Sequence, residues 1–261
     1  MDSETISRYG DELYTALRER TTIQPLTARE PEITIADGYH ISKHMVDRRL
    51  ADGEVIVGKK TGVTGIAVQR MLNVFQPDFG YLTDKMQYSN GAEMPISSEL
   101  IQPRAEGEIA FVLASDLVGP GVTNADVLAA TDYVVPCFEV VDSRIDNWQI
   151  KIQDTVADNA SSGLFLLGDD RAKPADVDFF SCGMVVEKNG EILSTGAGAA
   201  AMGSPVSCVA WLANTLGEFG IPLQAGEVIL SGSLVPLEPV VAGDEMKVTI
   251  AGIGTASVRF V

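Results

Sequence analysis

The stretch Arg104-Ala105-Glu106-Gly107-Glu108-Ile109-Ala110-Phe111-Val112-Leu113 joins two glutamates to a long apolar run. The apolar run predicts a strand, and strand side chains alternate between the two faces of a sheet. Glu106 and Glu108 are therefore expected to point to the same side. Gly107 lies between them and leaves the opposite side uncrowded.

A third glutamate, Glu139, interrupts a second apolar run, Val134-Val135-Pro136-Cys137-Phe138-Glu139-Val140-Val141. A buried carboxylate needs a partner, because burying it unpaired is costly. Three carboxylates from two strands would make an oxygen site suited to Mg²⁺ or Mn²⁺. The alternative is that Glu106 and Glu108 only mark the solvent face of an edge strand. The apolar surroundings of Glu139 favour the metal site.

The first part of the chain has a helical pattern. One helix face is formed by Ile6, Tyr9, Leu13 and Leu17. Thr34 followed by Asp37 predicts the N-cap of a second helix, which ends near Gly53. Residues 55–57 predict a short strand that leads to Lys59 and Lys60 in a glycine-bounded turn, and strand alternation would place these two lysines on opposite faces. A further short helix is suggested by Ala67, Met71 and Leu72.

The pattern changes to strands from about residue 80. Apolar runs predict strands at 109–113, 134–141, 163–167, 182–188, 191–195, 228–231, 245–250 and 255–260. Asn189-Gly190 predicts a hairpin turn, and helices are expected after Thr123 and from Ser204-Pro205 to about Phe219. We therefore expect an α+β protein: a helical N-terminal region, 1–75, followed by a curled, barrel-like β-rich catalytic domain, 76–261.

Composition excludes several classes of function. The 261 residues carry a net charge of −17, which disfavours binding to nucleic acids or anionic membranes. An anionic substrate would then need a local positive centre, such as a bound cation. The sequence has neither a secretory signal pattern nor an apolar run of membrane-spanning length, so we expect a cytoplasmic protein.

Cysteines, histidines and a glycine-rich segment offer other possible sites. The cysteines, Cys137, Cys182 and Cys208, lie in apolar settings and are expected to be reduced and buried. His40 and His44 have the spacing of a zinc pair but no further ligand nearby, so packing or surface roles are expected. The segment 195–203 lacks the lysine and hydroxyl residues of a nucleotide loop, and its backbone amides around Gly198 could bind a small carboxylate instead.

Several motifs, in the same order along nearly the whole chain, resemble the 2-hydroxypenta-2,4-dienoate (2-oxopent-4-enoate) hydratases of the fumarylacetoacetate hydrolase superfamily. The motifs are Gly58-Lys59-Lys60-Thr61-Gly62-Val63-Thr64, Gln76-Pro77-Asp78-Phe79-Gly80, Ile101-Gln102-Pro103-Arg104-Ala105-Glu106-Gly107-Glu108, Phe138-Glu139-Val140-Val141-Asp142-Ser143-Arg144, Asp154-Thr155-Val156-Ala157-Asp158-Asn159-Ala160-Ser161 and Thr195-Gly196-Ala197-Gly198-Ala199-Ala200. One position departs from the resemblance, because Gly65 stands where relatives often carry serine.

The resemblance implies a mixed β-roll with a metal site at its open end. It implies hydration of 2-hydroxypenta-2,4-dienoate to 4-hydroxy-2-oxopentanoate, in bacterial meta-cleavage degradation of aromatic compounds. It also implies that Mg²⁺ or Mn²⁺ binds Glu106, Glu108 and Glu139. The expected partners are the small dienoate, other copies of the chain in a homo-oligomer, and a 4-oxalocrotonate decarboxylase.

The resemblance also suggests roles for single residues. Lys60 is the first candidate for acid–base catalysis, since a desolvated lysine beside a cation has a lowered pKa; the alternative is an anchor for the substrate carboxylate. Asp78, expected in a turn, would orient Lys60 or a water. Substrate-binding roles are predicted for Arg104, which could also neutralise the glutamates, and for Ser161 and Gly198. Asp142 and Arg144 are expected to form a structural pair.

Three other functions remain open. A metal-dependent 4-oxalocrotonate decarboxylase would share the three glutamates, but such enzymes tend to have alanine between the first two and an apolar residue before the lysine. A C–C hydrolase of the same superfamily would use a histidine and a glutamate near the N-terminus, which His40 and His44 match poorly. A non-catalytic partner subunit of a decarboxylase is the third, and the retained glutamates argue against it.

Overall fold

The computed structural model describes the chain except for residues 67–68, 71–73 and 75. The short helix predicted from Ala67, Met71 and Leu72 lies outside the described residues. No helix in the part of the chain that the structure describes combines the length and the apolar character needed to cross a membrane.

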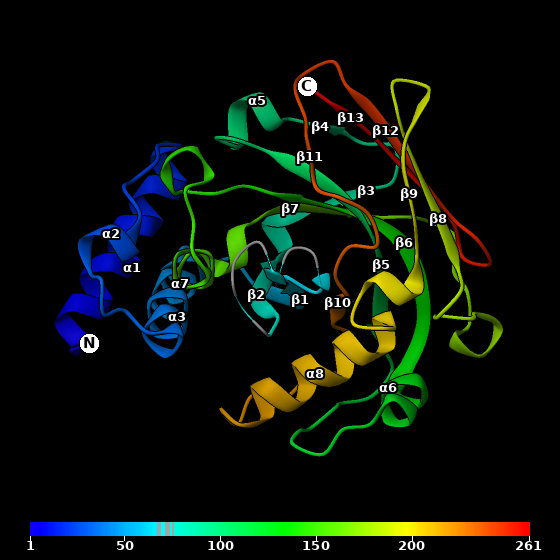
Figure 1. Ribbon diagram of the computed structural model, residues 1–261, viewed down its shortest axis with the longest axis horizontal. Helices are drawn as coiled ribbons and strands as arrows, with labels where there is room; N and C mark the ends of the chain where they lie inside the picture. Colours follow the sequence, from blue (N-terminus) through cyan, green and yellow to red (C-terminus); the bar gives the residue numbers. More distant parts are fainter. Residues whose placement is uncertain (67–68, 71–73, 75) are drawn as a thin grey trace.

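The N-terminal region consists of α1 (Ser3–Glu19), α2 (Leu26–Arg29) and α3 (Ile35–Ala51), which lie together at one side of the molecule (Figure 1). Tyr9 and Leu13 on α1 are buried, as the helical pattern predicts. Thr34 and Asp37 form the expected capping box at the start of α3. These helices pack against α7 (Ile152–Ala157), where buried Asp154 accepts hydrogen bonds from the backbone N–H and the side-chain hydroxyl of Thr27.

Within the described part of the chain, the strands form two sheets. The larger has eight strands, in the order β2-β1-β10-β5-β6-β7-β3 with β11 paired to β5. Their bounds are β1 Ile56–Gly62, β2 Asp78–Thr83, β3 Gln87–Ser89, β5 Arg104–Leu113, β6 Thr131–Val141, β7 Ser162–Leu167, β10 Val228–Leu230 and β11 Glu238–Pro239. The long strands β5 and β6 pair antiparallel at the centre.

The second sheet has five strands, in the order β4-β13-β12-β8-β9, and lies on the opposite side of the molecule from the N-terminal helices (Figure 1). Their bounds are β4 Glu93–Met94, β8 Gly183–Lys188, β9 Glu191–Ala197, β12 Glu245–Ile250 and β13 Gly254–Phe260. The sheets touch at Gly107, where an added Cβ would lie 3.0 Å from the Met184 sulfur and 3.1 Å from Val248. Glycine thus lets the second sheet pack directly behind the two glutamates of β5.

Helices and short turns of 3-10 helix cover the sheets. The longest of these elements is α8 (Pro205–Gly217), which begins after the capping residue Ser204 and is buried along most of its length. The remaining elements are α5 Ile96–Glu99, α6 Asn124–Ala130, η1 Asp84–Met86, η2 Asp146–Trp148, η3 Asn159–Ser161, η4 Pro174–Asp176 and η5 Gly198–Ala200.

The expected α+β class, with a helical N-terminal region and a curled β-rich part, is confirmed. All eight strands predicted after residue 80 are present, and α6 and α8 follow Thr123 and Ser204 as expected. Asp78 was wrongly expected in a turn: it begins β2, because its segment pairs with β1 despite the flanking proline and glycine. The domain boundary at residue 75 stays a prediction, and β1, which precedes it, pairs with β2 and β10 in the larger sheet.

Candidate active site

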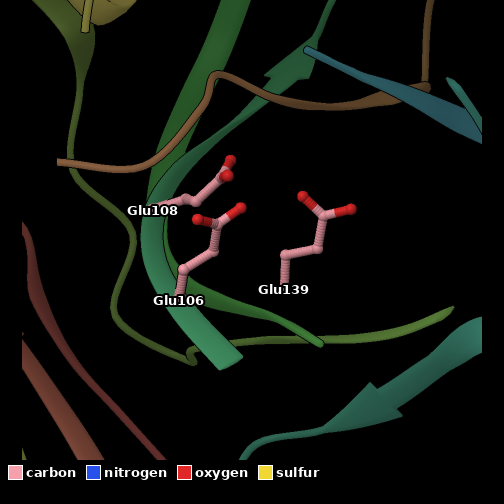
Figure 2. Close-up of side chains that lie close together, drawn as sticks. All are labelled: Glu106, Glu108 and Glu139. Atoms are coloured by element: carbon pink, nitrogen blue, oxygen red, sulfur yellow. The ribbon is translucent and has the colours of Figure 1, made fainter. Parts of the chain in front are cut away.

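Three glutamate side chains meet on one face of the larger sheet (Figure 2). Glu106 and Glu108 extend from the same side of β5, and Glu139 lies directly opposite Glu106 on β6. One carboxylate oxygen from each residue lies within 4.8 Å of the others. The predicted convergence of the three carboxylates is therefore present, and the two strands that carry them are the longest in the sheet.

The protein leaves much of this oxygen cluster unpaired. Among the described residues, Glu108 Oε1 and both oxygens of Glu139 are buried without a hydrogen-bond partner. Glu108 Oε2 accepts from the backbone N–H of Gly232 at 2.8 Å. Buried acceptors are normally satisfied, so these oxygens fit a bound cation better than a closed protein core.

Burial and mutual repulsion act on all three carboxyl groups. Burial and the neighbouring Glu139 raise the pKa of Glu106 to about 8, and burial with the same neighbour raises the pKa of Glu108 well above its usual range. Burial also raises the pKa of Glu139, while Lys60 opposes the rise. A divalent cation would offset the repulsion among three carboxylates that the protein alone leaves in contact.

Lys60 on β1 is buried and points into the same cluster. Its Nζ lies 3.1 Å from Glu139 Oε1, as an ion pair whose angle falls outside hydrogen-bond geometry. Burial alone would lower the pKa of Lys60, but the charges of Glu139 and Asp78 and the other glutamates raise it. The lowered pKa expected from the sequence depends on a bound cation and stays a prediction, while the four carboxylates around this lysine act in the opposite direction.

Lys59 and Lys60 were wrongly expected in a turn: both lie within β1, which pairs with β2 and β10 beyond the short apolar run. Lys59 points to the other face of the strand, as alternation predicts. Its Nζ contacts both carboxylate oxygens of Glu227, at 2.5 and 2.6 Å, in a buried ion pair. Glu227 Oε2 also accepts from the backbone N–H of Gln224. Lys59 is thus fully engaged away from the glutamate cluster.

Asp78 lies beside Lys60, at the start of β2 and opposite Gly62 on β1. Its Oδ2 accepts a hydrogen bond from Thr155 Oγ1 at 3.4 Å, and its buried Oδ1 has no hydrogen-bond partner within the described part of the chain. A Cβ added to Gly62 would lie 2.3 Å from Asp78 Oδ1 and 3.4 Å from Lys60 Nζ. Glycine at 62 therefore allows both groups to occupy one small space. Burial raises the pKa of Asp78, and the charge of Lys60 opposes the rise.

The three residues predicted to bind substrate have different surroundings. Ser161 is buried, with its Oγ 3.2 Å from Thr155 Oγ1, so it joins the Asp78 side of the site. Arg104 is half-buried, and its guanidinium lies over the Trp148 ring, 4.8 Å from the centroid. Gly198 begins η5, where its N–H donates to Cys182 and an added Cβ would lie 1.9 Å from the Phe179 carbonyl oxygen. This close packing explains the glycine, and carboxylate binding at Gly198 stays a prediction.

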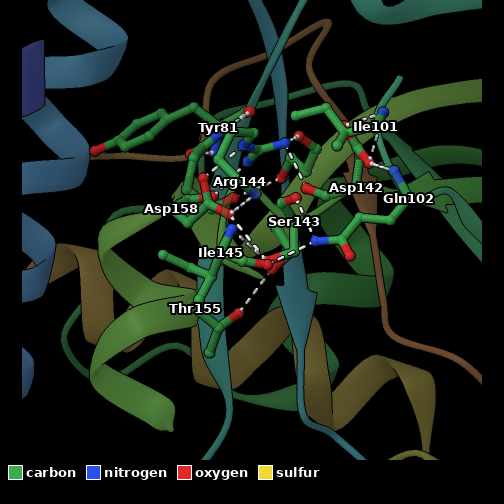
Figure 3. A network of polar contacts seen from close by, with 12 residues as sticks. Tyr81, Ile101, Gln102, Asp142, Ser143, Arg144, Ile145, Thr155 and Asp158 are labelled. Carbon is green, nitrogen blue, oxygen red and sulfur yellow. Dashed lines mark hydrogen bonds and ion pairs between the residues drawn. The ribbon is translucent and has the colours of Figure 1, made fainter. Parts of the chain in front are cut away.

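The predicted pair of Asp142 and Arg144 is wrong. Arg144 instead pairs with Asp158, at 2.5 Å from Nε to Oδ1, while the Asp142 carboxylate accepts from the backbone N–H groups of Ile101 and Gln102 (Figure 3). The chain turns after β6, which directs Arg144 toward the segment before β7. Thr155 and Gly232, which contact Asp78 and Glu108, were not predicted as neighbours of the site. Thr155 lies in one of the motifs quoted above, but a hydroxyl residue alone does not indicate a site.

The expectations for cysteine and histidine hold. Cys137, Cys182 and Cys208 are free and buried. His44 contacts Asp11 at 3.0 Å and His40 is exposed on α3, so both have surface or packing roles.

Comparison with known proteins identifies the family to which the chain belongs. The profile described as "Fumarylacetoacetate (FAA) hydrolase C-terminal" matches residues 54–261. The chain is 68% identical over 221 residues to a 2-hydroxypent-2,4-dienoate hydratase of Pseudomonas putida, covering 85% of this chain and 100% of the relative. It is 57% identical over 260 residues to a 2-hydroxyhexa-2,4-dienoate hydratase of Comamonas testosteroni, covering 99% and 98%.

A solved structure is similar over the whole fold. It is 4-oxalocrotonate decarboxylase from Pseudomonas putida G7, complexed with magnesium and adipate, with a TM-score of 0.96 and 39% identity. The match covers 100% of this chain and 99% of that one. A second structure of the same enzyme, complexed with calcium and acetate, gives a TM-score of 0.95.

Proposed function

The chain belongs to the fumarylacetoacetate hydrolase family, and from that premise we propose that it is a hydratase that converts 2-hydroxypenta-2,4-dienoate to 4-hydroxy-2-oxopentanoate. The observation that carries the proposal is high identity to hydratases over most of the chain, joined to an intact cluster of three glutamates. Such a reaction belongs to bacterial degradation of aromatic compounds by meta-cleavage.

We propose that Glu106, Glu108 and Glu139 hold a divalent cation, Mg²⁺ or Mn²⁺. The support is the set of buried carboxylate oxygens that have no hydrogen-bond partner in the part of the chain that the structure describes. When bound, the cation would supply Lewis-acid stabilisation of negative charge on the oxygen at C2 of the substrate. Gly232 would hold Glu108 from behind, through its backbone N–H.

Hydration requires several proton transfers. In the net reaction the 2-hydroxyl group and the water each lose a proton, while C3 and C5 each gain one. Lys60 is buried among carboxylates that favour its charged form, so its Nζ holds a proton beside the site. The pKa of Lys60 would be lowered by a cation bound to the glutamates, which would favour donation of that proton. Burial raises the pKa of Asp78, and its Oδ1 has no hydrogen-bond partner among the residues that the structure describes, so this oxygen is suited to accept a proton.

We propose that the remaining polar groups near the site bind the substrate. Ser161 would offer its hydroxyl oxygen from the Asp78 side, and Arg104 a positive charge from the first residue of β5. The backbone at Gly198 is a further candidate for the substrate carboxylate. The positive charges matter because the chain as a whole carries −17 and would otherwise repel an anion.

The rival is decarboxylation, which the likeness to 4-oxalocrotonate decarboxylase favours. Gly107 between the glutamates and Lys59 before Lys60 favour the hydratase, as does the higher identity to hydratases. The test is to incubate the protein and Mg²⁺ with enzymatically generated 2-hydroxypenta-2,4-dienoate and identify the product. We expect 4-hydroxy-2-oxopentanoate; release of carbon dioxide from 2-oxo-3-hexenedioate without any hydration of the dienoate would establish the decarboxylase instead.

We further propose a cytoplasmic homo-oligomer that associates with a 4-oxalocrotonate decarboxylase. Functional association would pass a reactive dienol directly between two enzymes that act on related 2-oxo acids. Size-exclusion chromatography with light scattering measures the oligomer, and co-purification with a decarboxylase tests the complex.

A further inference from the structure

We infer that Thr155 is a positioning residue for Asp78, because its hydroxyl engages one carboxylate oxygen and leaves the other free to exchange a proton in the site. The inference rests on the proposed hydratase function. It concerns a residue on α7, outside the strands that carry the glutamates and Lys60.

The hydrogen bonds around Thr155 have a defined direction. Its Oγ1 lies 3.4 Å from Asp78 Oδ2 and 3.2 Å from Ser161 Oγ. An ionised carboxylate only accepts, and a threonine hydroxyl has one proton to donate. Thr155 therefore donates to Asp78, and Ser161 must donate to Thr155. The chain of hydrogen bonds runs from Ser161 through Thr155 to Asp78.

This arrangement explains the unpaired oxygen of Asp78. Oδ1 is buried without a hydrogen-bond partner among the described residues, and it lies against Gly62 on the side of Lys60. An unmet acceptor of this kind costs free energy unless a ligand or water meets it. Because Thr155 holds Oδ2, the carboxylate presents Oδ1 to the space it shares with Lys60.

The backbone that delivers Ser161 is unusual. Asn159, Ala160 and Ser161 are consecutive buried residues with φ of 52°, 51° and 53°, in the left-handed region that non-glycine residues rarely adopt. Such a conformation persists only when the surroundings enforce it. Arg144 holds both ends of this turn: it donates to the carbonyl oxygen of Asp158 at 2.7 Å and to that of Ser162 at 3.0 Å. Arg144 and Asp158 are labelled in Figure 3.

A second contact fixes the turn against β2. The Asn159 side chain accepts from the Tyr81 backbone N–H at 2.8 Å and donates to the Tyr81 carbonyl at 2.9 Å. Tyr81 lies three residues after Asp78 on the same strand. The turn that brings Ser161 to Thr155 is therefore fixed in position relative to the strand that carries Asp78. The left-handed backbone thus helps to hold Ser161, Thr155 and Asp78 together.

The test compares Thr155→Val, which removes the hydroxyl and keeps the shape, with Thr155→Ser, which keeps the hydroxyl. We expect Thr155→Val to lower kcat by about tenfold to 10²-fold, since small misplacements of catalytic groups have effects of this size. KM and Mg²⁺ affinity by calorimetry should stay close to wild type. The melting temperature should fall by only a few degrees, because Asp78 and Ser161 lose a buried hydrogen-bond partner. Thr155→Ser should restore most of kcat. Thr131→Val is the control, because the buried Thr131 hydroxyl donates to the Val127 carbonyl, away from the site.

Two kinetic results would overturn the inference: kcat within twofold of wild type in Thr155→Val, or equal losses in the valine and serine variants. A crystal structure of Thr155→Val gives a readout independent of turnover. We expect the Asp78 carboxylate to rotate away from its wild-type orientation, and an unchanged orientation would contradict a positioning role. Failure of the wild-type chain to hydrate the dienoate would instead count against the proposed function, while the crystal structure would still decide the role of Thr155.

Discussion

One buried polar cluster lies on the larger sheet and a second lies just past the end of its strand β6, and they differ in how completely the protein satisfies them. In the Arg144 network, made of Arg144, Asp158, Asp142 and their backbone partners, the guanidinium donates to a carboxylate and three carbonyl oxygens, and both aspartates accept from backbone N–H groups. In the glutamate cluster, buried oxygens of Glu108 and Glu139 lack hydrogen-bond partners among the described residues, although Lys60 forms an ion pair with Glu139. A complete network stabilises the fold by itself, whereas an incomplete one is suited to a ligand.

Glu106→Gln should give the largest effect and test the incomplete cluster. We expect turnover with Mg²⁺ to fall by about 10³-fold or more, since Lewis-acid stabilisation supplies several kcal/mol. The metal-free variant should melt no lower than the metal-free wild type, because one of three repelling carboxylates is gone. Steady-state kinetics and calorimetry measure both, with exposed Glu93→Gln as the control. Full activity of wild-type protein in excess chelator would show that the cluster needs no cation.

Arg144→Met should lower the stability of the fold, because it breaks the complete network. It leaves Asp158 buried without its ion-pair partner, which typically costs about 3–5 kcal/mol of folding free energy. Arg171→Met is the matched control, since Arg171 is exposed over the Tyr133 ring and should contribute only about 0.5–1 kcal/mol. Urea unfolding measures both, and equal midpoints for the two variants would contradict a structural role for Arg144.

Lys60→Met and Lys59→Met compare two adjacent lysines, one at the incomplete glutamate cluster and one in a satisfied ion pair. Lys60 faces the glutamate cluster, so its loss should lower kcat by about 10²-fold or more and leave metal affinity largely intact. Lys59 belongs to a satisfied pair with Glu227, so its loss should keep kcat but reduce stability by about 3–5 kcal/mol. Equal losses of kcat, or a change confined to KM in Lys60→Met, would remove Lys60 from acid–base chemistry.

Adding Mg²⁺ should give the smallest effect and complete the glutamate cluster. At a concentration about 100 times Kd, binding to the folded state alone stabilises it by about 2.7 kcal/mol. For a chain of this size we expect a rise of several degrees in melting temperature, measured by differential scanning calorimetry. The rise should be absent in Glu106→Gln and retained in Lys59→Met. A similar rise in Glu106→Gln would place the cation elsewhere.

Local periodicity predicted most of the strands and much of the site. The alternation of side chains placed Glu106 with Glu108 and separated Lys60 from Lys59, and both predictions agree with the structure. The alignment of Glu106 opposite Glu139 was not predictable in detail, because register depends on how β5 and β6 pair over their whole length.

Contacts between distant segments were harder to predict. The partner of Arg144 was assigned to its sequence neighbour Asp142, whereas the side chain reaches Asp158 across a turn. The short strands β2, β3, β4 and β11 gave too little apolar pattern to be recognised. The inferred positioning role of Thr155 was missed because it depends on a left-handed turn at Asn159-Ala160-Ser161. These residue types do not predict such a turn from the sequence.

The contact between Asn159 and Tyr81 also bears on the solubility of the protein. Strand β2 is the outermost strand at one end of the larger sheet, and the free backbone groups of such a strand can recruit strands from other molecules. The Asn159 amide occupies both the N–H and the carbonyl of Tyr81, as a neighbouring strand would. The turn beside Asp78 thus also helps to cover the edge of β2, whose residues are mostly buried, and a chain that lost this turn would expose that edge to self-association.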